Sequence, residues 1–289
     1  MKKLLGILCV AMLVMVSGCK DATTSVSNGS DVIMRVGNTT VTKENVNTLL
    51  KLHTGYNSVL QDVIQKILDA EITITEEIEK AAKESLEQSK ENLGDYFLSS
   101  IEKSGYTDEE DYYRSVSLNG VLRKELTKKY LVEENQIEKY HPFKAQMLIA
   151  KDQESANKAL EELQNGIPFE EVTQQYGDVS KSDGTITIYH SGSGLPAIVT
   201  EKITNTAQAQ LLEEVITDSA NSVYYVVNIV DYDYKNFVDE ATTAIIEKTT
   251  SLNDEAIAFY LKKHQFKVYD VDIYNGIKQT NPTYLVQDQ

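Results

Sequence analysis

The sequence predicts an α+β protein in which helical segments flank a small mixed domain. Apolar residues repeat with helical spacing up to about residue 141, strand-like and helical stretches alternate over 142–231, and helical spacing returns over 232–273. With 289 residues, 41% of them hydrophobic, the chain is long enough to bury more than one core. We therefore expect two globular domains.

The first helical part, 31–141, opens with a short two-stranded element. Val32–Val36 and Thr39–Thr42 have strand-like composition and are separated by a turn at Gly37 and Asn38. A helical stripe follows, made of Tyr56, Val59, Leu60, Val63, Ile64, Ile67 and Leu68.

Two further helices are predicted by capping signals. Thr73 with Glu76, and Thr107 with Glu110, have the spacing of a capping box, in which the hydroxyl and the carboxylate satisfy free backbone N–H groups. The first of these helices should run to about Asn92. The segment 31–141 is therefore predicted to be mainly helical.

The middle segment, 142–231, changes composition at Pro142. A strand is predicted at Ala145–Ala150, then two helices separated by Gly166, a strand-like run at Thr185–His190, and a long final strand at Val223–Val230. The first helix carries Ala156, Ala159, Leu160 and Leu163, and the second carries Phe169, Val172 and Tyr176. This order predicts a small α+β domain that ends on a central strand.

The last part returns to helical spacing over 232–273 and ends in a tail, 274–289. One stripe contains Phe237, Ala241, Ile245 and Ile246, and the next contains Ala256, Phe259, Tyr260 and Leu261.

The N-terminus has the pattern of an export signal. Lys2 and Lys3 precede the apolar segment Leu4–Val16, which is too short to span a membrane comfortably, and Ser17-Gly18-Cys19 follows. These residues resemble the bacterial lipobox, which implies a signal at 1–18 that is cleaved before Cys19, and a diacylglyceryl group on that cysteine. Residues 19–30 would be a lipidated, flexible tether to the outer face of the cell membrane. The alternative is an ordinary secretory signal with a chance cysteine.

Composition excludes several classes of function. The cysteines are Cys9, inside the signal, and Cys19, so no disulfide is expected. The formal charge of −16 becomes −18 once Lys2 and Lys3 leave with the signal, and such a charge excludes nucleic acid as a partner.

No cofactor or metal site is predicted. The four histidines, His53, His141, His190 and His264, lack metal-ligand spacing, and no Walker loop, G-x-S-x-G or G-x-G-x-x-G motif is present.

The order of these segments resembles the PrsA-type extracytoplasmic foldases, which are themselves similar to the periplasmic chaperone SurA. The resemblance rests on the lipobox, the G-x-x-x-V-T phrase at Gly37–Thr42, the α+β segment of about 90 residues, and Phe266–Asp270, which matches a short closing strand. It implies a helical chaperone domain, formed by both ends of the chain, with an inserted parvulin-type peptidyl-prolyl isomerase domain.

The catalytic motifs of parvulins are incomplete in this chain. The family's first strand, A-x-H-I-L-V, is matched to Lys144–Ile149, which puts Gln146 at the first histidine, and the last strand puts Tyr225 at the second. Asp178 matches the acidic position, with Val179 as the alternative because the loop is one residue short. Neither glutamine nor tyrosine has a near-neutral pKa, so the resemblance implies weak or lost isomerase activity.

Three functions remain open at this stage. The first is a membrane-anchored foldase or holdase whose partners are unfolded or newly secreted proteins, bound in an apolar groove of the helical domain. The second is a working prolyl isomerase, which must lower a rotation barrier of about 18–20 kcal/mol. The third is a structural surface lipoprotein. The sequence indicates neither the client proteins nor the oligomeric state.

Overall fold

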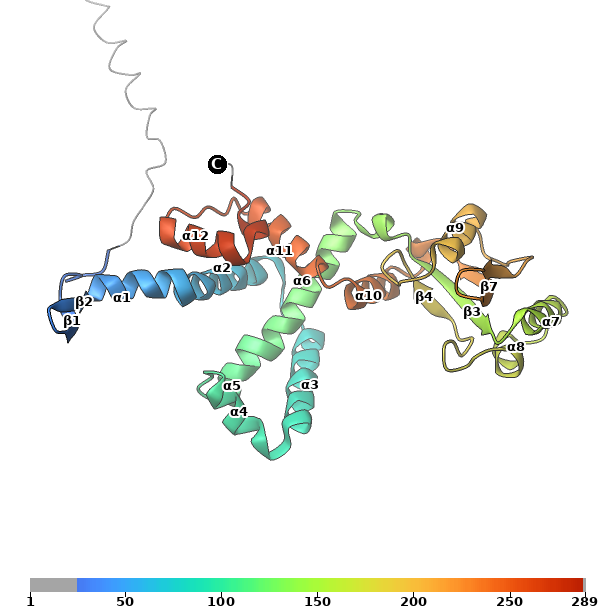
Figure 1. Ribbon diagram of the computed structural model, residues 1–289, viewed down its shortest axis with the longest axis horizontal. Helices are drawn as coiled ribbons and strands as arrows, with labels where there is room; N and C mark the ends of the chain where they lie inside the picture. The colour runs from blue at the N-terminus through green and yellow to red at the C-terminus, as the bar shows by residue number, and fades with distance from the viewer. Residues whose placement is uncertain (1–24, 288–289) are drawn as a thin grey trace, which may run out of the picture. The chain divides into compact units, whose positions relative to one another are not determined.

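The computed structural model describes residues 25–287 and divides the chain into two compact units. One unit combines Met1–Leu122 with Asp254–Gln289, and the other is Arg123–Asn253. The predicted inserted domain, 142–231, lies within the second unit, which extends beyond it at both ends. Figure 1 labels the elements of both units.

The first unit begins with the predicted hairpin. Strands β1 (Val32–Val36) and β2 (Thr39–Thr42) pair in antiparallel fashion and form a two-stranded sheet. Gly37 has a φ of 59°, a left-handed conformation that glycine adopts without strain. Both predicted strands are therefore confirmed.

A nearly continuous helical segment follows the hairpin. It consists of α1 (Lys43–Leu50), a π-helical turn η1 (Lys51–Gly55) and α2 (Tyr56–Glu71). The whole predicted stripe lies on α2, where Leu60, Ile64, Ile67 and Leu68 are buried.

The next helices of this unit start later than the capping signals predict. Helix α3 (Glu76–Leu93) is capped by Thr75, whose hydroxyl accepts from the N–H of Ile78, so the predicted cap at Thr73 is wrong. The remaining elements are η2 (Gly94–Tyr96), α4 (Phe97–Lys103), α5 (Glu109–Tyr112) and the π-helical η3 (Tyr113–Leu118). Helix α5 is capped by Asp108 rather than Thr107, because the extended residue directly before a helix is the one whose side chain reaches the free N–H groups. Helix α6 (Asn119–Glu133) follows.

The C-terminal part of the chain adds α11 (Leu252–Lys263), α12 (Val271–Thr280) and η6 (Pro282–Tyr284). The strand predicted at Phe266–Asp270 is wrong, since Phe266–Tyr269 has no strand structure. The Gln287 side chain satisfies the backbone of Val268 instead, accepting from its N–H at 2.6 Å and donating to its carbonyl at 3.2 Å.

The second unit is built on an antiparallel sheet. Its strands are β3 (Phe143–Ala150), β4 (Thr187–Tyr189), β5 (Gln210–Leu211), β6 (Ile216–Asp218) and β7 (Val223–Asp231). The order is β4-β3-β7-β5, and β6 also pairs with β7. The prediction of a central final strand is confirmed, because β7 pairs with β3, β5 and β6.

Helices of the second unit complete two cores on opposite faces of this sheet. They are α7 (Gln153–Gln164), α8 (Phe169–Tyr176), α9 (Ala197–Thr206) and α10 (Val238–Lys248), with short η4 (Ile137–Tyr140) and η5 (Tyr234–Asn236). Leu148 and Val226 pack with α7 and α8 on one face, whereas Met147 and Val227 pack with α9 on the other. This division follows from the alternation of side chains along a strand.

Candidate functional site

Gln146 is the centre of a hydrogen-bond network on the α8 face of the sheet. Its side-chain nitrogen donates to Glu170 Oε1 at 2.9 Å and to the carbonyl of Gly184 at 3.1 Å. Its side-chain oxygen accepts from the Asn228 amide of the neighbouring strand at 3.0 Å. The residue is buried, with 8% of its surface exposed. These bonds use the amide's two donors and one of its acceptor sites. Gln146 therefore binds the loop at Gly184 and has no donor left for a ligand.

Tyr225 lies on the other face of the same sheet. In the β3–β7 register Gln146 is opposite Asn228, whereas Tyr225 is opposite Ile149. Tyr225 and Asn228 are three positions apart on β7, an odd offset, so their side chains point to opposite faces. Tyr225 is buried in the core that contains Met147 and Val199, and burial raises the pKa of its hydroxyl. Gln146 and Tyr225 therefore do not converge.

Asp178 follows α8 and lies beside the end of β3. Its backbone N–H donates to the carbonyl of Ile149 at 2.7 Å. Its carboxylate accepts from the hydroxyl of Ser180 at 2.6 Å and forms an ion pair with Lys181 at 3.3 Å. The hydrogen bond from Ser180, and then the one from Lys181, hold the pKa of Asp178 below its usual range. The carboxylate is bound within its own loop and has no hydrogen bond to Gln146 or Tyr225.

A one-residue shift of the parvulin motif along β3 changes the residue at its first histidine position. If the alanine of A-x-H-I-L-V is placed on Ala145, the histidine position falls on Met147 instead of Gln146. Met147 shares its sheet face with Tyr225. A shift of one residue changes the face of the sheet, so the two matches differ in whether the first position shares a face with Tyr225. On this register both family histidines are replaced, by a thioether and a phenol.

His190 is a buried histidine with two bonded ring nitrogens. Nδ1 accepts from the N–H of Gly192 at 3.0 Å, and Nε2 lies 3.2 Å from the carbonyl of Ala244 on α10. Because a backbone N–H can only donate, Nδ1 is unprotonated and Nε2 carries the proton. Burial lowers the pKa of His190. This histidine joins a loop to α10 and has a structural role.

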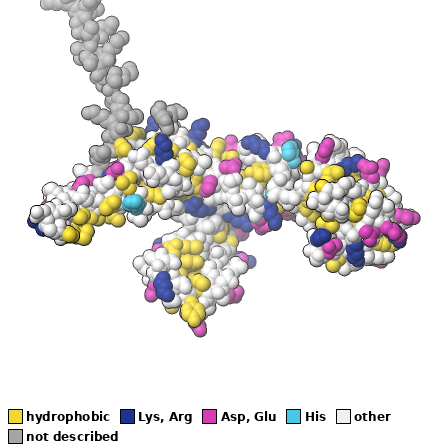
Figure 2. All heavy atoms as spheres, in the orientation of Figure 1, with side chains coloured by type: hydrophobic (Ala, Val, Ile, Leu, Met, Phe, Trp, Pro, Cys, Tyr) yellow, Lys and Arg dark blue, Asp and Glu magenta, His cyan; other side chains and the backbone are white. Residues whose placement is uncertain are grey.

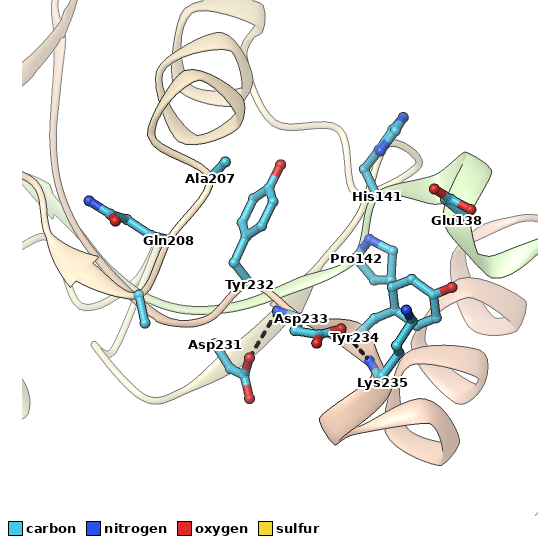
Figure 3. A pocket seen from close by; sticks show the side chains of 11 residues that line it. Glu138, His141, Pro142, Ala207, Gln208, Asp231, Tyr232, Asp233, Tyr234 and Lys235 are labelled. Atoms are coloured by element: carbon cyan, nitrogen blue, oxygen red, sulfur yellow. Dashed lines mark hydrogen bonds between the residues drawn. The ribbon is translucent and has the colours of Figure 1, made fainter.

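A cavity of about 500 Å³ lies where the chain enters and leaves the sheet of the second unit. Figure 3 shows Tyr232, Tyr234, His141 and the carboxylates around it. Gln146, Asp178 and Tyr225 are not among the residues that line it. Two of the carboxylates are bound by their own turn, since Asp231 accepts from Asp233 N–H and Asp233 accepts from Lys235 N–H.

Large apolar side chains are exposed at the turn between α3 and α4 of the first unit. Tyr96 is 74% exposed, Leu98 59% and Leu93 39%. In contrast, Phe97 and Ile101 of α4 are buried, and the ring of Phe97 makes an edge-to-face contact with that of Tyr112, with centroids 5.4 Å apart. The turn is thus fixed from inside while its outer side chains face solvent. Figure 2 shows hydrophobic side chains at this end of the α3–α4 segment. We call Leu93, Tyr96 and Leu98 the apolar tip.

Among residues 25–287, no cluster of three or more histidine, cysteine, aspartate or glutamate side chains could hold a metal ion. Within the same range, none of the helices has the length and hydropathy needed to cross a bilayer. Cys19 lies outside the described residues, so its lipidation stays a prediction.

The fold is that of a two-unit protein. Both ends of the chain form a helical unit, and the intervening residues Arg123–Asn253 form a unit built on an antiparallel sheet. No family model matches the chain. Foldase protein PrsA 2 of Bacillus cereus is 27% identical over 93% of this chain and 94% of its own length, and PrsA 2 of Bacillus anthracis is 25% identical over 88% and 90%. A crystal structure of PrsA from Bacillus cereus covers 88% of the chain at 19% identity with a TM-score of 0.48.

The curated relatives are similar to this chain over nearly their full length. The predicted resemblance to PrsA-type foldases is therefore confirmed. The lipid anchor and the altered isomerase site stay predictions.

Proposed function

We propose that this protein is an extracytoplasmic foldase that holds newly exported polypeptides after translocation and has weak or no prolyl isomerase activity. The observation that carries the proposal is the similarity to curated PrsA foldases over 93% of the chain. Its partners would be unfolded or newly secreted proteins.

The apolar tip is the surface that we assign to client binding. Unfolded chains expose apolar side chains, and contact with Tyr96 and Leu98 would remove apolar surface of both partners from water. The predicted apolar groove is replaced in this proposal by a convex, exposed turn. Helix α3, which leads to the tip, is rich in exposed glutamate and lysine, so the helix itself remains hydrated.

The geometry of the sheet supports weak or lost isomerase activity. Catalysis of prolyl rotation requires polar groups that stabilise a twisted amide beneath one pocket. Gln146 is occupied by three partners, Asp178 is bound by Ser180 and Lys181, and Tyr225 lies on the opposite sheet face from Gln146. These three residues remain the candidate catalytic set only as a prediction.

Cys19 would hold the protein at the outer face of the membrane. A diacylglyceryl group carries two acyl chains, which anchor a protein stably where one chain binds only marginally. Anchoring would keep the apolar tip at high local concentration near translocating clients.

A holdase assay tests the proposal directly. The protein should delay aggregation of a denatured exported enzyme on dilution from urea. Changing Tyr96 to Ser together with Leu98→Asn should remove most of this effect. Ile186→Asn is a matched control, because Ile186 is 55% exposed and lies on the sheet unit. Wild-type protein that never delays aggregation would contradict the proposal.

A proline-limited refolding assay tests the isomerase alternative. Uncatalysed isomerisation takes tens of seconds, so acceleration is easily seen. We expect wild type and Asp178→Ala both to refold a proline-limited substrate at the rate of buffer alone. Strong acceleration by wild type that Asp178→Ala abolishes would establish the enzyme instead.

A further inference from the structure

The β1–β2 hairpin exposes an unusual amount of apolar surface. Val32 is 49% exposed, Ile33 52%, Met34 54% and Val36 80%, and every residue of β1 is exposed. Leu49 and Leu50, at the end of α1, are 53% and 56% exposed. Figure 2 shows hydrophobic side chains gathered at this end of the unit, where Figure 1 places β1, β2 and α1. We call the β1 and α1 residues together the hairpin patch.

The hairpin is a two-stranded sheet with nothing further paired to it in the described residues. Strand β1 pairs with β2, and no third strand joins them. A two-stranded hairpin is at best marginally stable in water on its own, so a surface that covers its apolar side chains would stabilise it. Lone exposed apolar residues are ordinary, but a run on one strand marks an interaction surface.

The position of the hairpin in the chain keeps it near the predicted membrane anchor. Only residues 20–30 separate the predicted lipidated Cys19 from Asp31. Eleven residues span at most about 40 Å when fully extended, so the hairpin cannot lie farther than that from the membrane surface. This argument depends on the lipid anchor that we propose above.

Local charge favours the same surface. From Asp31 to Glu44 two basic side chains, Arg35 and Lys43, balance two acidic ones, so this segment is neutral although the whole chain carries −16. Bacterial membranes present anionic headgroups, which attract basic residues near the surface and repel the acidic remainder of the chain. A client chain has no such relation to the tether.

We propose that the hairpin patch rests on the membrane surface. The side chains of Met34 and Val36, which share one face of β1, would enter the boundary between headgroups and acyl chains, and Arg35 would contact anionic lipid beside the strand. Together with the acyl chains on Cys19, this second contact would fix the orientation of the first unit rather than leave it free on its tether.

Site-specific quenching tests the contact. Lipidation consumes the thiol of Cys19, so Ile33→Cys gives the mature protein a single reactive thiol for an environment-sensitive dye. The full lipidated protein is placed in vesicles of phosphatidylcholine and phosphatidylglycerol that contain nitroxide lipid. We expect the dye at residue 33 to be quenched about threefold more strongly than a dye at Ile186→Cys, because interfacial insertion reaches about 5–10 Å into the bilayer. Adding Val36→Asn and Met34→Gln should reduce that quenching to the level of the control.

Each other outcome would overturn the proposal. Equal quenching at residues 33 and 186 on protein that floats with the vesicles excludes the hairpin contact and leaves the anchor intact. Protein that does not float excludes the anchor, and the hairpin contact with it. A dye response without vesicles that grows with protein concentration, or with added unfolded client, assigns the patch to a second copy or to the client. The same preparation is assayed for aggregation delay, so loss of the membrane contact is distinguished from loss of holdase function.

Discussion

Gln146 and Asn228 lie directly opposite each other on β3 and β7, and the Asn228 amide donates to the Gln146 side-chain oxygen at 3.0 Å. This pair lies on the α8 face of the sheet, whereas Tyr225 lies on the α9 face. Gln146, the polar residue at the centre of the sheet, is therefore held by hydrogen bonds within the second unit.

We expect Gln146→Leu to destabilise the second unit. The change leaves the Gly184 carbonyl and the Asn228 amide without this partner, and an unsatisfied buried polar group costs about 1–3 kcal/mol. Urea denaturation should show that the free energy of unfolding of Gln146→Leu is lower than that of wild type by this amount. The matched control is Gln164→Leu at the exposed end of α7, expected within about 0.5 kcal/mol of wild type. Equal stability of the two variants would contradict the assigned role.

Two pairs of histidine substitutions test the face assignment. Gln146→His with Tyr225→His puts the imidazoles on opposite faces, so we expect no acceleration of proline-limited refolding. Met147→His with Tyr225→His puts both on one face as diagonal neighbours, about 7–8 Å apart at the backbone. Circular dichroism of each pair checks that it folds. Acceleration by the first pair alone would show that our register of the catalytic motif is incorrect.

The sequence predicts the elements with strong periodicity and misses those defined by long-range pairing. The α2 stripe and the strands at β3 and β7 are confirmed, because burial on one face or on both leaves a repeating apolar pattern. Strands β5 and β6, of two and three residues, are too short to show a period. Of the strand predicted at Phe266–Asp270, Phe266–Tyr269 has no strand structure, and the Gln287 side chain bonds the backbone N–H and carbonyl of Val268.

The candidate site was less predictable than the fold. Residue identity alone placed Gln146 and Tyr225 together, since a motif match carries no information on which sheet face each residue occupies. The strand register supplies that information: Gln146 pairs with Asn228, and Tyr225 pairs with Ile149. The partners of Gln146 come from α8, a loop and β7, and this convergence has no local sequence signal.

We expect the second unit to lose stability in mild acid through His190. Burial lowers the pKa of the folded-state imidazole below the usual 6.5, with a smaller contribution from the charge of Lys248. The unfolded chain therefore binds the proton first, so stability is fully present above about pH 6.5 and falls as the pH drops below it. Urea midpoints at pH 7.5 and pH 5.5 measure this loss. His190→Gln should be less stable at pH 7.5 but show a smaller difference between the two pH values. An unchanged difference would assign the acid sensitivity to other groups.

The last prediction concerns the ion pairs between η1 and α12 in the first unit. Lys51 Nζ lies 2.9 Å from Asp272 and 3.4 Å from Asp270, and both Lys51 and Asp270 are largely buried. The hydrogen bond that Lys51 donates to Asp272 raises the pKa of Lys51. Lys51→Met leaves two neighbouring carboxylates without this cation. Breaking a buried ion pair costs about 3–5 kcal/mol. Because this site is partly solvated, we expect the free energy of unfolding to fall by about 1–3 kcal/mol.

Urea denaturation of Lys51→Met measures that loss. The matched control is Lys66→Met, because Lys66 forms an exposed pair with Asp62 within one helix, and such pairs contribute about 0.3–0.5 kcal/mol. If Lys51→Met is no less stable than Lys66→Met, the pairing with Asp270 and Asp272 does not hold η1 against α12. If the loss is present, the double variant Lys51→Glu with Asp272→Lys should be more stable than Lys51→Glu alone, because the pair re-forms with opposite polarity. The restoration is partial, because Asp270 then lies beside the carboxylate introduced at position 51.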